Sequence, residues 1–465
     1  MAPGIDRRSF LGAGAALAAG LAAPRVARAS SARTADRRFA PTARNVIFMV
    51  SDGMSTGTLT LADMACRSRF DRSSNWVSLW RQEGVHRASA FTASADSAVT
   101  DSAAGGCAWG CGRHINNEVL NILPNGTEMP PILPHAKAHG KATGVVTTAR
   151  VTHATPASFY ANCPNRAREK QIAAQLAERP IDLALGGGAA YFTAQSLAPF
   201  TVVRTRDELL GTRELAPGKR LLGLFADEHV PYVLDRTPAA PSLAEMSATA
   251  LRLLDSRPNG FVLQIEGGRV DHAAHHNDAP SLIAEQLDFD AAVGTALEFM
   301  KGRDDTLLIL TSDHGNANPG LTFYGPGGAK RFSRLTNAKH SFDWIFEQLA
   351  KAPGVKGHPD KAGVALADLV GQATGVSLAA PEIEMLAGVM AGKRISPFAE
   401  SNKPETVLGA ILADTLGVAF LSPNHTSDMV EVTALGPGAD LLPDIIENVE
   451  LWGLMVRSLA LEPAR

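Results

Sequence analysis

Five short apolar runs, each followed at once by glycine or polar residues, constrain the fold of this chain more than any other feature. They are residues 45–50 before Ser51-Asp52-Gly53, 144–146 before Thr147-Thr148, 181–185 before Gly186-Gly187-Gly188, 261–265 before Glu266-Gly267-Gly268, and 307–310 before Thr311-Ser312-Asp313-His314. Continuous apolar runs of this length are typical of parallel strands buried on both faces. The polar residues then lie at the carboxyl ends of the strands, where parallel sheets bind their ligands.

Helical patterns separate these runs. One apolar stripe consists of Leu282, Phe289, Val293, Leu297 and Met300, with Asp288 and Glu298 off it. Strands that alternate with helices predict an α/β fold, a doubly wound and mostly parallel sheet sandwiched by helices. The stretch 321–421 mixes Gly/Pro-rich pieces with short amphipathic helices. We predict that it is a crown-like insertion over the ligand-binding end of the sheet.

Length and composition narrow the possibilities further. A chain of 465 residues allows two or three domains, or one large α/β domain with an insertion. A hydrophobic fraction of 45% excludes wholesale disorder, and a formal net charge of -3 argues against binding of nucleic acid by a basic face. Four cysteines are too few for a disulfide-framed scaffold. We expect buried thiols, although an oxidising destination would permit a bridge such as Cys66–Cys163.

The first 29 residues have the pattern of an export signal. Arg7-Arg8 precedes an uncharged run at 10–23 rich in Ala, Gly and Leu, and Ala27-Arg28-Ala29 is a small-x-small cleavage site. We predict twin-arginine export with removal of 1–29, an exposed segment at 30–43 and one large domain at 44–465. The alternative is an uncleaved anchor, but the run is short and weakly apolar for a transmembrane helix. A periplasmic or secreted protein with no stable membrane insertion after cleavage is therefore expected.

The sharpest chemical motif follows the run at 261–265. Asp271 and His275 are four residues apart, so a helix would place the carboxylate and the imidazole on one face, where both can bind one metal ion. The alternative is a surface turn rich in histidine. Three histidines within five residues, directly after a buried strand, favour the metal site.

Two further strand ends carry candidate ligands. The adjacent Asp313 and His314 suit a zinc ligand pair, and the carboxylate of Asp52 could bridge two cations. Each of these acids alone fits a helix cap or a turn former equally well. Several such acids at strand ends of one sheet together favour a ligand site.

Ser102 is a candidate nucleophile. It follows Asp101 and precedes Ala103-Ala104-Gly105-Gly106, small residues that could open a helix, so its hydroxyl would lie at the positive end of the helix dipole. An ordinary N-cap is the alternative. Metal ions nearby would lower the pKa of the hydroxyl and remove the need for a histidine base.

His425 and Arg166 are weaker candidates. His425 precedes a strand-like run at 429–432, and Arg166 lies in a polar stretch. An arginine can hold a phosphate group through two hydrogen bonds. A structural histidine and a surface arginine are the alternatives.

These motifs together resemble a known family. The sequence is similar to the bacterial and animal alkaline phosphatases from about residue 44 to the C-terminal region. The similarity is densest at Thr100-Asp-Ser-Ala-Ala, Thr152-His-Ala-Thr-Pro-Ala, Glu266-Gly-Gly-Arg-Val-Asp-His, Thr311-Ser-Asp-His-Gly and His425-Thr426. The five motifs occur in the family's order, whereas the insertion at 321–421 matches poorly in detail.

The resemblance implies an enzyme that hydrolyses small phosphate monoesters, releases inorganic phosphate and uses two Zn and one Mg. The implied ligands are Asp271, His275 and His425 for the first Zn, Asp52, Asp313 and His314 for the second, and Asp52, Thr155 and Glu266 for Mg. Ser102 would attack phosphorus and form a phosphoseryl intermediate, which water activated on the first Zn would hydrolyse. Arg166, helped by Asp101, would hold two phosphate oxygens. Members of the family are usually homodimers.

The chain departs from some bacterial members beside the implied Mg site. His153 and His272 stand where those members have Asp and Lys, as in the animal enzymes. An imidazole in place of a carboxylate permits Zn or loosely bound Mg at the third site, and His272 could meet the phosphate through a water.

Three other functions compete with this one. A sulfatase would show Cys or Ser followed by x-Pro-x-Arg, which Ser102-Ala103-Ala104-Gly105-Gly106 lacks. A phosphodiesterase would lack an arginine placed like Arg166. A periplasmic binding protein for metal or phosphate would not need a nucleophile and a full ligand set.

Overall fold

The structure is a computed structural model that describes residues 43–215, 219–324, 326–355 and 358–461. The predicted export signal at 1–29 lies outside the described residues, as does the predicted exposed segment at 30–43 apart from Ala43.

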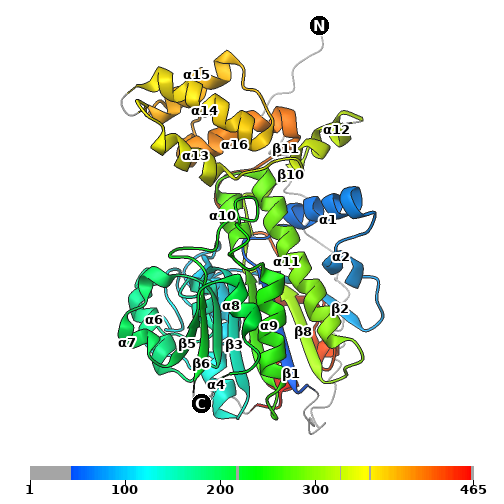
Figure 1. Ribbon diagram of the computed structural model, residues 1–465. Helices are drawn as coiled ribbons and strands as arrows, with labels where there is room; N and C mark the ends of the chain where they lie inside the picture. Colours follow the sequence, from blue (N-terminus) through cyan, green and yellow to red (C-terminus); the bar gives the residue numbers. More distant parts are fainter. Residues whose placement is uncertain (1–42, 216–218, 325, 356–357, 462–465) are drawn as a thin grey trace, which may run out of the picture. The chain divides into compact units, whose positions relative to one another are not determined.

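A ten-stranded sheet forms the centre of the domain (Figure 1). Its strands are β1 (Asn45–Ser51), β2 (Val85–Phe91), β3 (Ala142–Arg150), β4 (Leu183–Gly187), β5 (Phe200–Val203), β6 (Arg220–Leu224), β7 (Phe261–Gly267), β8 (Thr306–Thr311), β13 (Val430–Leu435) and β14 (Ile445–Glu447). They lie in the order β14-β2-β13-β8-β1-β7-β3-β4-β6-β5. β13 runs antiparallel to both β8 and β2, and the other neighbours pair in parallel. The predicted α/β fold with a mostly parallel sheet is confirmed.

Alternate residues of the central strand β1 pack into two separate hydrophobic clusters. Val46 and Phe48 belong to the first, and Ile47 and Met49 to the second, as the two-residue repeat of a strand requires. The first cluster includes residues of α3 (Ser102–Gly110), α4 (Ile132–Ala138), α5 (Ala154–Ser158), α6 (Glu169–Glu178) and α17 (Glu450–Ser458). The second includes residues of α2 (Asn75–Leu79), α8 (Arg206–Gly211), α9 (Leu243–Asp255) and α11 (Ala279–Met300). The sheet is therefore covered by helices on both faces.

Four of the five predicted apolar runs lie in strands β1, β3, β7 and β8 of this sheet. The run at 181–185 overlaps β4 from Leu183 on, and the run at 429–432 overlaps β13. The stripe from Leu282 to Met300 lies on α11, and Leu282, Phe289 and Val293 are fully buried there. The sequence patterns did not predict β2, β5, β6 or β14. These lie toward the two edges of the sheet. Partial exposure weakens the apolar signal of β2, in which only Ala88 and Ala90 are buried, whereas β6 is short but almost wholly buried.

The stretch 321–421 holds a third hydrophobic cluster. Its helices are α12 (Pro326–Leu335), α13 (Phe342–Lys351), α14 (Pro359–Thr374), α15 (Ala380–Met390) and α16 (Pro404–Leu416). Residues of these helices pack with Leu61 and Ala65 of α1 (Thr56–Phe70) and with Ala279 and Ile283 of α11. A two-stranded pairing of β10 (Gly320–Leu321) with β11 (Val418–Ala419) brings the two ends of the stretch together. Its role as a crown-like insertion stays a prediction.

The cysteines are free thiols. All four are buried and unbridged, as expected: Cys66, Cys107, Cys111 and Cys163. The alternative, a disulfide between Cys66 and Cys163, is not formed. Burial raises the pKa of the Cys66 thiol to about 11, which keeps it protonated. Among the described residues, the helices are all too short or too polar to cross a membrane.

Candidate active site

The carboxyl ends of four neighbouring strands, β8, β1, β7 and β3, carry the candidate site. Asp52 follows β1 directly, Glu266 is the next-to-last residue of β7, and Asp313 lies two residues after β8. Because the carboxyl ends of parallel strands meet at one edge, residues far apart in the sequence lie together here. Asp52, Glu266 and Asp313 are all fully buried.

A short strand pair adds the last candidate ligand. β12 (His425–Thr426) pairs antiparallel with β9 (Gly315–Asn316), which begins directly after His314. The rings of His314 and His425 stack with their centroids 3.6 Å apart. The pairing therefore carries His425 from near the C-terminal end of the domain to the end of β8.

Asp271, His275 and His425 form the first group. Asp271 and His275 lie on α10 (Arg269–His275), and Oδ2 of Asp271 is 3.3 Å from Nε2 of His275. Nε2 of His425 is 3.0 Å from Nε2 of His275 and 3.5 Å from Oδ1 of Asp271. The Nδ1 atoms of the two imidazoles face backbone carbonyls, of Pro423 at 2.6 Å and of Thr100 at 2.9 Å. Each Nδ1 therefore carries the proton, and the two Nε2 atoms point at the same place.

This first group requires a positive charge. Two Nε2 lone pairs facing each other beside a carboxylate would repel unless a proton or a metal ion lay between them. Although burial acts against it, the hydrogen bond and charge of Asp271 raise the pKa of His425 to about 9. A metal ion can take the place of that proton, and the carbonyls that hold both Nδ1–H groups are the outer-shell partners typical of metal-bound histidine. The residues thus fit a metal ion.

Asp52, Asp313 and His314 form the second group, beside Ser102. Nε2 of His314 lies 3.2 Å from Oδ2 of Asp313, 3.7 Å from Oδ1 of Asp52 and 3.3 Å from the Ser102 hydroxyl. Burial and the charge of Asp313 raise the pKa of Asp52, and burial raises that of Asp313 to about 6. Oδ1 of Asp52 and Oδ2 of Asp313 have no hydrogen-bond partner among the described residues. Buried carboxylate oxygens without a hydrogen-bond partner are costly, and a bound cation would remove that cost.

Glu266, Thr155 and Asp52 meet in a third group. The hydroxyl of Thr155 donates to Oδ2 of Asp52 at 3.2 Å, and the hydroxyl of Thr147 donates to Glu266. Burial raises the pKa of Glu266 to about 7, and its Oε1 has no hydrogen-bond partner in the described part of the chain. His153 is a further potential ligand in this group. One ring nitrogen of His153 and one carboxylate oxygen each of Asp52 and Glu266 lie within 4.8 Å of one another. The carboxylate and hydroxyl oxygens fit a hard cation such as Mg²⁺. The imidazole of His153 also permits a cation that binds nitrogen, such as Zn²⁺.

Ser102 is the first residue of α3 and is buried. Asp101 is the N-cap and accepts a hydrogen bond from the backbone N–H of Ala104 at 2.9 Å. Gly105, one turn into the helix, lets α3 approach Asp313, because a Cβ there would lie 3.1 Å from the Cβ of Asp313. The hydroxyl therefore faces the second group from the amino end of a helix.

Arg166 lies beside this serine helix. Its Nη1 donates to Oδ2 of Asp101 at 2.9 Å, and its Nη2 donates to Nε2 of His153 at 3.1 Å. The charge of Asp101 raises the pKa of the guanidinium even though burial opposes it. A fixed, charged guanidinium at this position can hold two oxygens of an anion.

Known proteins match both the sequence and the fold. The sequence profile of the alkaline phosphatase family matches residues 43–202 and 194–461. Alkaline phosphatase 4 of Bacillus subtilis is 28% identical over 436 residues, which is 90% of this chain and 88% of that protein. The crystal structure of Thermus thermophilus alkaline phosphatase superposes with a TM-score of 0.82 at 31% identity and covers 90% of this chain and 92% of that one. The crystal structure of a cold-active alkaline phosphatase from Shewanella sp. superposes with a TM-score of 0.75 at 26% identity. It covers 89% of this chain and 99% of that one.

This chain belongs to the alkaline phosphatase family. It is a hydrolase of phosphoric monoesters, in agreement with the function that the motifs predicted. Enzymes of the family depend on metal ions, and the ligand atoms of three residue groups in this alkaline phosphatase lie close enough to bind one. The groups are Asp271, His314 and His425; Asp52, Asp313 and His314; and Asp52, His153 and Glu266.

His229 and Thr147 of this alkaline phosphatase touch the site and were not singled out from the sequence. The ring of His229 lies against His153 and His272, with centroids 5.4 Å and 4.3 Å apart, and Arg150 donates to its Nε2 at 2.7 Å. Burial lowers the pKa of His229, so the ring is neutral. The hydroxyl of Thr147 donates to Glu266. Thr147 ends a predicted strand and could have been suspected, whereas His229 follows a charged turn and carried no such signal.

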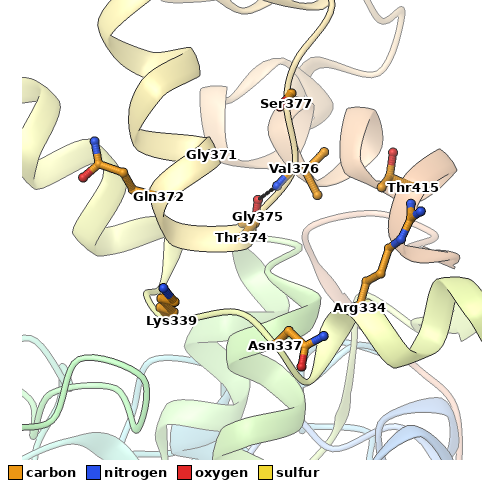
Figure 2. A pocket seen from close by; sticks show the side chains of 10 residues that line it. All are labelled: Arg334, Asn337, Lys339, Gly371, Gln372, Thr374, Gly375, Val376, Ser377 and Thr415. Atoms are coloured by element: carbon orange, nitrogen blue, oxygen red, sulfur yellow. Dashed lines mark hydrogen bonds between the residues drawn. The ribbon is translucent and has the colours of Figure 1, made fainter.

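A cavity of about 510 Å³ in the phosphatase lies away from these residues (Figure 2). Its walls come from the stretch 321–421 and include Arg334, Lys339, Thr374 and Thr415. The hydroxyl of Thr374 accepts a hydrogen bond from the backbone of Val376, drawn in the figure. Because it includes none of the candidate ligands, the cavity is separate from the active site.

Proposed function

We propose that this alkaline phosphatase works with two Zn and one Mg through a phosphoseryl intermediate on Ser102. The proposed ligands are Asp271, His275 and His425 for the first Zn, Asp52, Asp313 and His314 for the second, and Asp52, Thr155 and Glu266 for the third ion. The observation that carries the proposal is the convergence of the His275 and His425 Nε2 atoms beside Asp271. Bound cations would neutralise the buried carboxylates and stabilise negative charge on the phosphate and on the departing oxygen.

The side chains of this chain have separate tasks in the reaction. The Ser102 oxygen attacks phosphorus, and its new bond forms as the bond between phosphorus and the ester oxygen breaks and the alcohol leaves. Water then breaks the Ser102 ester, which restores the hydroxyl and releases inorganic phosphate. Arg166, oriented by Asp101 at 2.9 Å, holds two phosphate oxygens that do not react.

The identity of the third ion depends on His153 and His272. His153 shares the third group with Asp52 and Glu266, and its ring lies 5.4 Å from that of His272. Nitrogen near an otherwise oxygen-lined site favours Zn relative to Mg. We propose Mg as the resident ion, with Zn or loosely held Mg as the alternative.

A phosphodiesterase or sulfatase activity is the competing function on such a site. A diester has one free phosphate oxygen fewer than a monoester, so the paired N–H groups of Arg166 would be only half used. Ser102 is followed by Ala103 and Ala104 instead of the x-Pro-x-Arg of a sulfatase. Both features favour monoesters.

The test of the function uses paired substrates and a serine variant. The purified enzyme is assayed with an aryl phosphate monoester and the matching diester, with added Zn and Mg and after EDTA. We expect monoester turnover to dominate, to vanish in EDTA, and to fall by more than about 10³-fold in Ser102→Ala. Ser247→Ala, which removes a buried serine of α9, is the control and should keep its activity. Full activity of Ser102→Ala would exclude the covalent mechanism, and a dominant diester activity would exclude the substrate class.

We also propose twin-arginine export to the periplasm or medium and assembly as a homodimer. The support is the Arg7-Arg8 pattern and the cleavage site before Ser30. Replacing both arginines by lysine should leave the enzyme in the cytoplasm, and N-terminal sequencing of the exported protein should begin at Ser30. Sedimentation of the purified enzyme tests the dimer.

A further inference from the structure

Asn316 is a buried residue of β9 that touches the first group of ligands from two sides. Its backbone is paired with that of His425 in the β9–β12 ladder, and its side chain is fully buried. It lies two residues after His314. One asparagine is therefore close to candidate ligands from three different segments.

The side-chain amide of Asn316 is bound to Asp271. Nδ2 donates to Oδ1 of that carboxylate at 2.7 Å and also lies 3.2 Å from its backbone carbonyl. Two contacts to one residue fix the position of the amide and the torsion of the carboxylate together. The other carboxylate oxygen, Oδ2, is left facing His275 at 3.3 Å.

Among the described residues, Asn316 is the one neutral side chain that donates a hydrogen bond to the Asp271 carboxylate. A Cβ added at Gly53 would lie 2.4 Å from Oδ1 of Asp271. The carboxylate therefore packs directly against the backbone of this glycine. Three histidines also lie near the carboxylate. His275 and His425 are the other proposed ligands of the same ion, and His314 is a proposed ligand of the second ion. If all three bind metal, the amide of Asn316 is the neutral donor that holds the carboxylate in place.

We propose that Asn316 is a positioning residue for the first metal site: its amide fixes the Asp271 carboxylate and its backbone fixes His425, so that both meet the ion at one place. This inference rests on the proposed function, since it needs Asp271 and His425 to be ligands. An amide carries no charge and does not titrate, so the donor itself does not change with pH. Loss of such an outer-shell partner typically weakens metal binding by about 10- to 100-fold.

Two substitutions separate positioning from packing. Asn316→Leu keeps the branched shape and loses the donor, whereas Asn316→Ala loses both. If the amide acts by donating a hydrogen bond, the two variants weaken metal binding alike. If the side chain only fills space, Asn316→Leu binds metal as the natural enzyme does. Asn448→Ala, which truncates an equally buried asparagine outside the site, controls for general destabilisation.

The readout is zinc affinity, measured on the full chain by competition with a chromogenic chelator, together with the visible absorption of the Co²⁺-substituted protein. We expect one of the Zn equivalents to bind about 10- to 100-fold more weakly in both Asn316 variants, with a changed Co²⁺ spectrum. Asn448→Ala should match the natural enzyme in both measurements. Unchanged affinity and spectrum in Asn316→Leu would overturn the inference. Failure of the unsubstituted enzyme to bind Zn would instead overturn the proposed function.

Discussion

The Nε2 atoms of His275 and His425 lie 3.0 Å apart, with both Nδ1 atoms held by backbone carbonyls. The two rings come from opposite ends of a long stretch of chain, one from α10 and the other from β12. Neither can turn its protonated nitrogen toward the other without giving up a hydrogen bond to a carbonyl. The pair is therefore arranged in advance for a cation.

His425→Ala should remove the first metal site and leave the fold largely intact. The substitution removes the imidazole, and the backbone pairing of β12 with β9 does not need that ring. We expect about one Zn per chain fewer by elemental analysis, with activity reduced by more than about 10²-fold. His358→Ala, at an exposed histidine, is the matched control. An unchanged Zn content in His425→Ala would contradict the ligand assignment.

Arg166→Ala should damage monoester hydrolysis more than diester hydrolysis. The guanidinium is oriented by Asp101 at 2.9 Å and would hold two oxygens of a monoester but only one free oxygen of a diester. Loss of a charged, bidentate contact corresponds to about 10- to 100-fold in kcat/KM for the monoester. Steady-state kinetics on both substrates measure the difference. Equal losses for both esters would show that Arg166 does not contact the second oxygen.

Gly53→Ala should disturb the site through a single methyl group. Gly53 has a φ of 66°, and an added Cβ would lie 2.4 Å from Oδ1 and 2.9 Å from Cβ of Asp271. The variant should lose both melting temperature and Zn content. Gly84→Ala shares the positive φ, at 79°, but its Cβ would meet no atom within 4 Å. It should show only the conformational cost, about 1 kcal/mol. Equal losses of melting temperature and Zn content in the two variants would contradict the expected displacement of Asp271 by the added methyl group.

Glu285 should make stability fall as pH rises from about 4.5 to about 7. Burial raises the pKa of this carboxyl to about 7 from an ordinary value near 4.5. The folded protein then holds the proton more tightly than the unfolded chain, so the stability from this group is complete below pH 4.5 and lost between pH 4.5 and 7. Glu285→Gln keeps an acceptor for the backbone N–H of Val233, 2.6 Å away.

Melting temperatures of the metal-loaded enzyme test this expectation. The advantage of Glu285→Gln over the natural enzyme should grow by a few degrees from pH 5 to pH 8. Glu298→Gln, at an exposed position of the same helix, should show no such trend. A constant difference between Glu285→Gln and the natural enzyme across this range would refute the expectation.

Sequence patterns were sufficient for the central strands and for the residues that follow them. Asp52, Glu266 and Asp313 could be grouped because parallel strands end at one edge, and the structure brings all three together there. The spacing of four residues predicted that a helix would place Asp271 and His275 on one face, and both lie on α10. His425 depended on the resemblance to a family, since a lone histidine before a strand has no distinctive pattern.

The remaining contacts depend on tertiary packing that no local pattern encodes. His229 reaches the site because the loop after β6 folds against Arg150, which donates to its ring. Asn316 reaches Asp271 across 45 positions of sequence. Strand β14, at one edge of the sheet, has only three residues, of which one is buried, so it gives little periodic signal.

The late position of β12 in the chain has a consequence for how the enzyme is made. β13, which follows it, pairs antiparallel between β8 and β2, so the sheet cannot close around the site until nearly all of the domain has been synthesised. A growing chain that ends before residue 425 has Ser102 and Asp52 but no complete first group of ligands. Contacts this distant in sequence form slowly, because the intervening loop must close first. We therefore expect phosphatase activity only from chains that have been synthesised past β13.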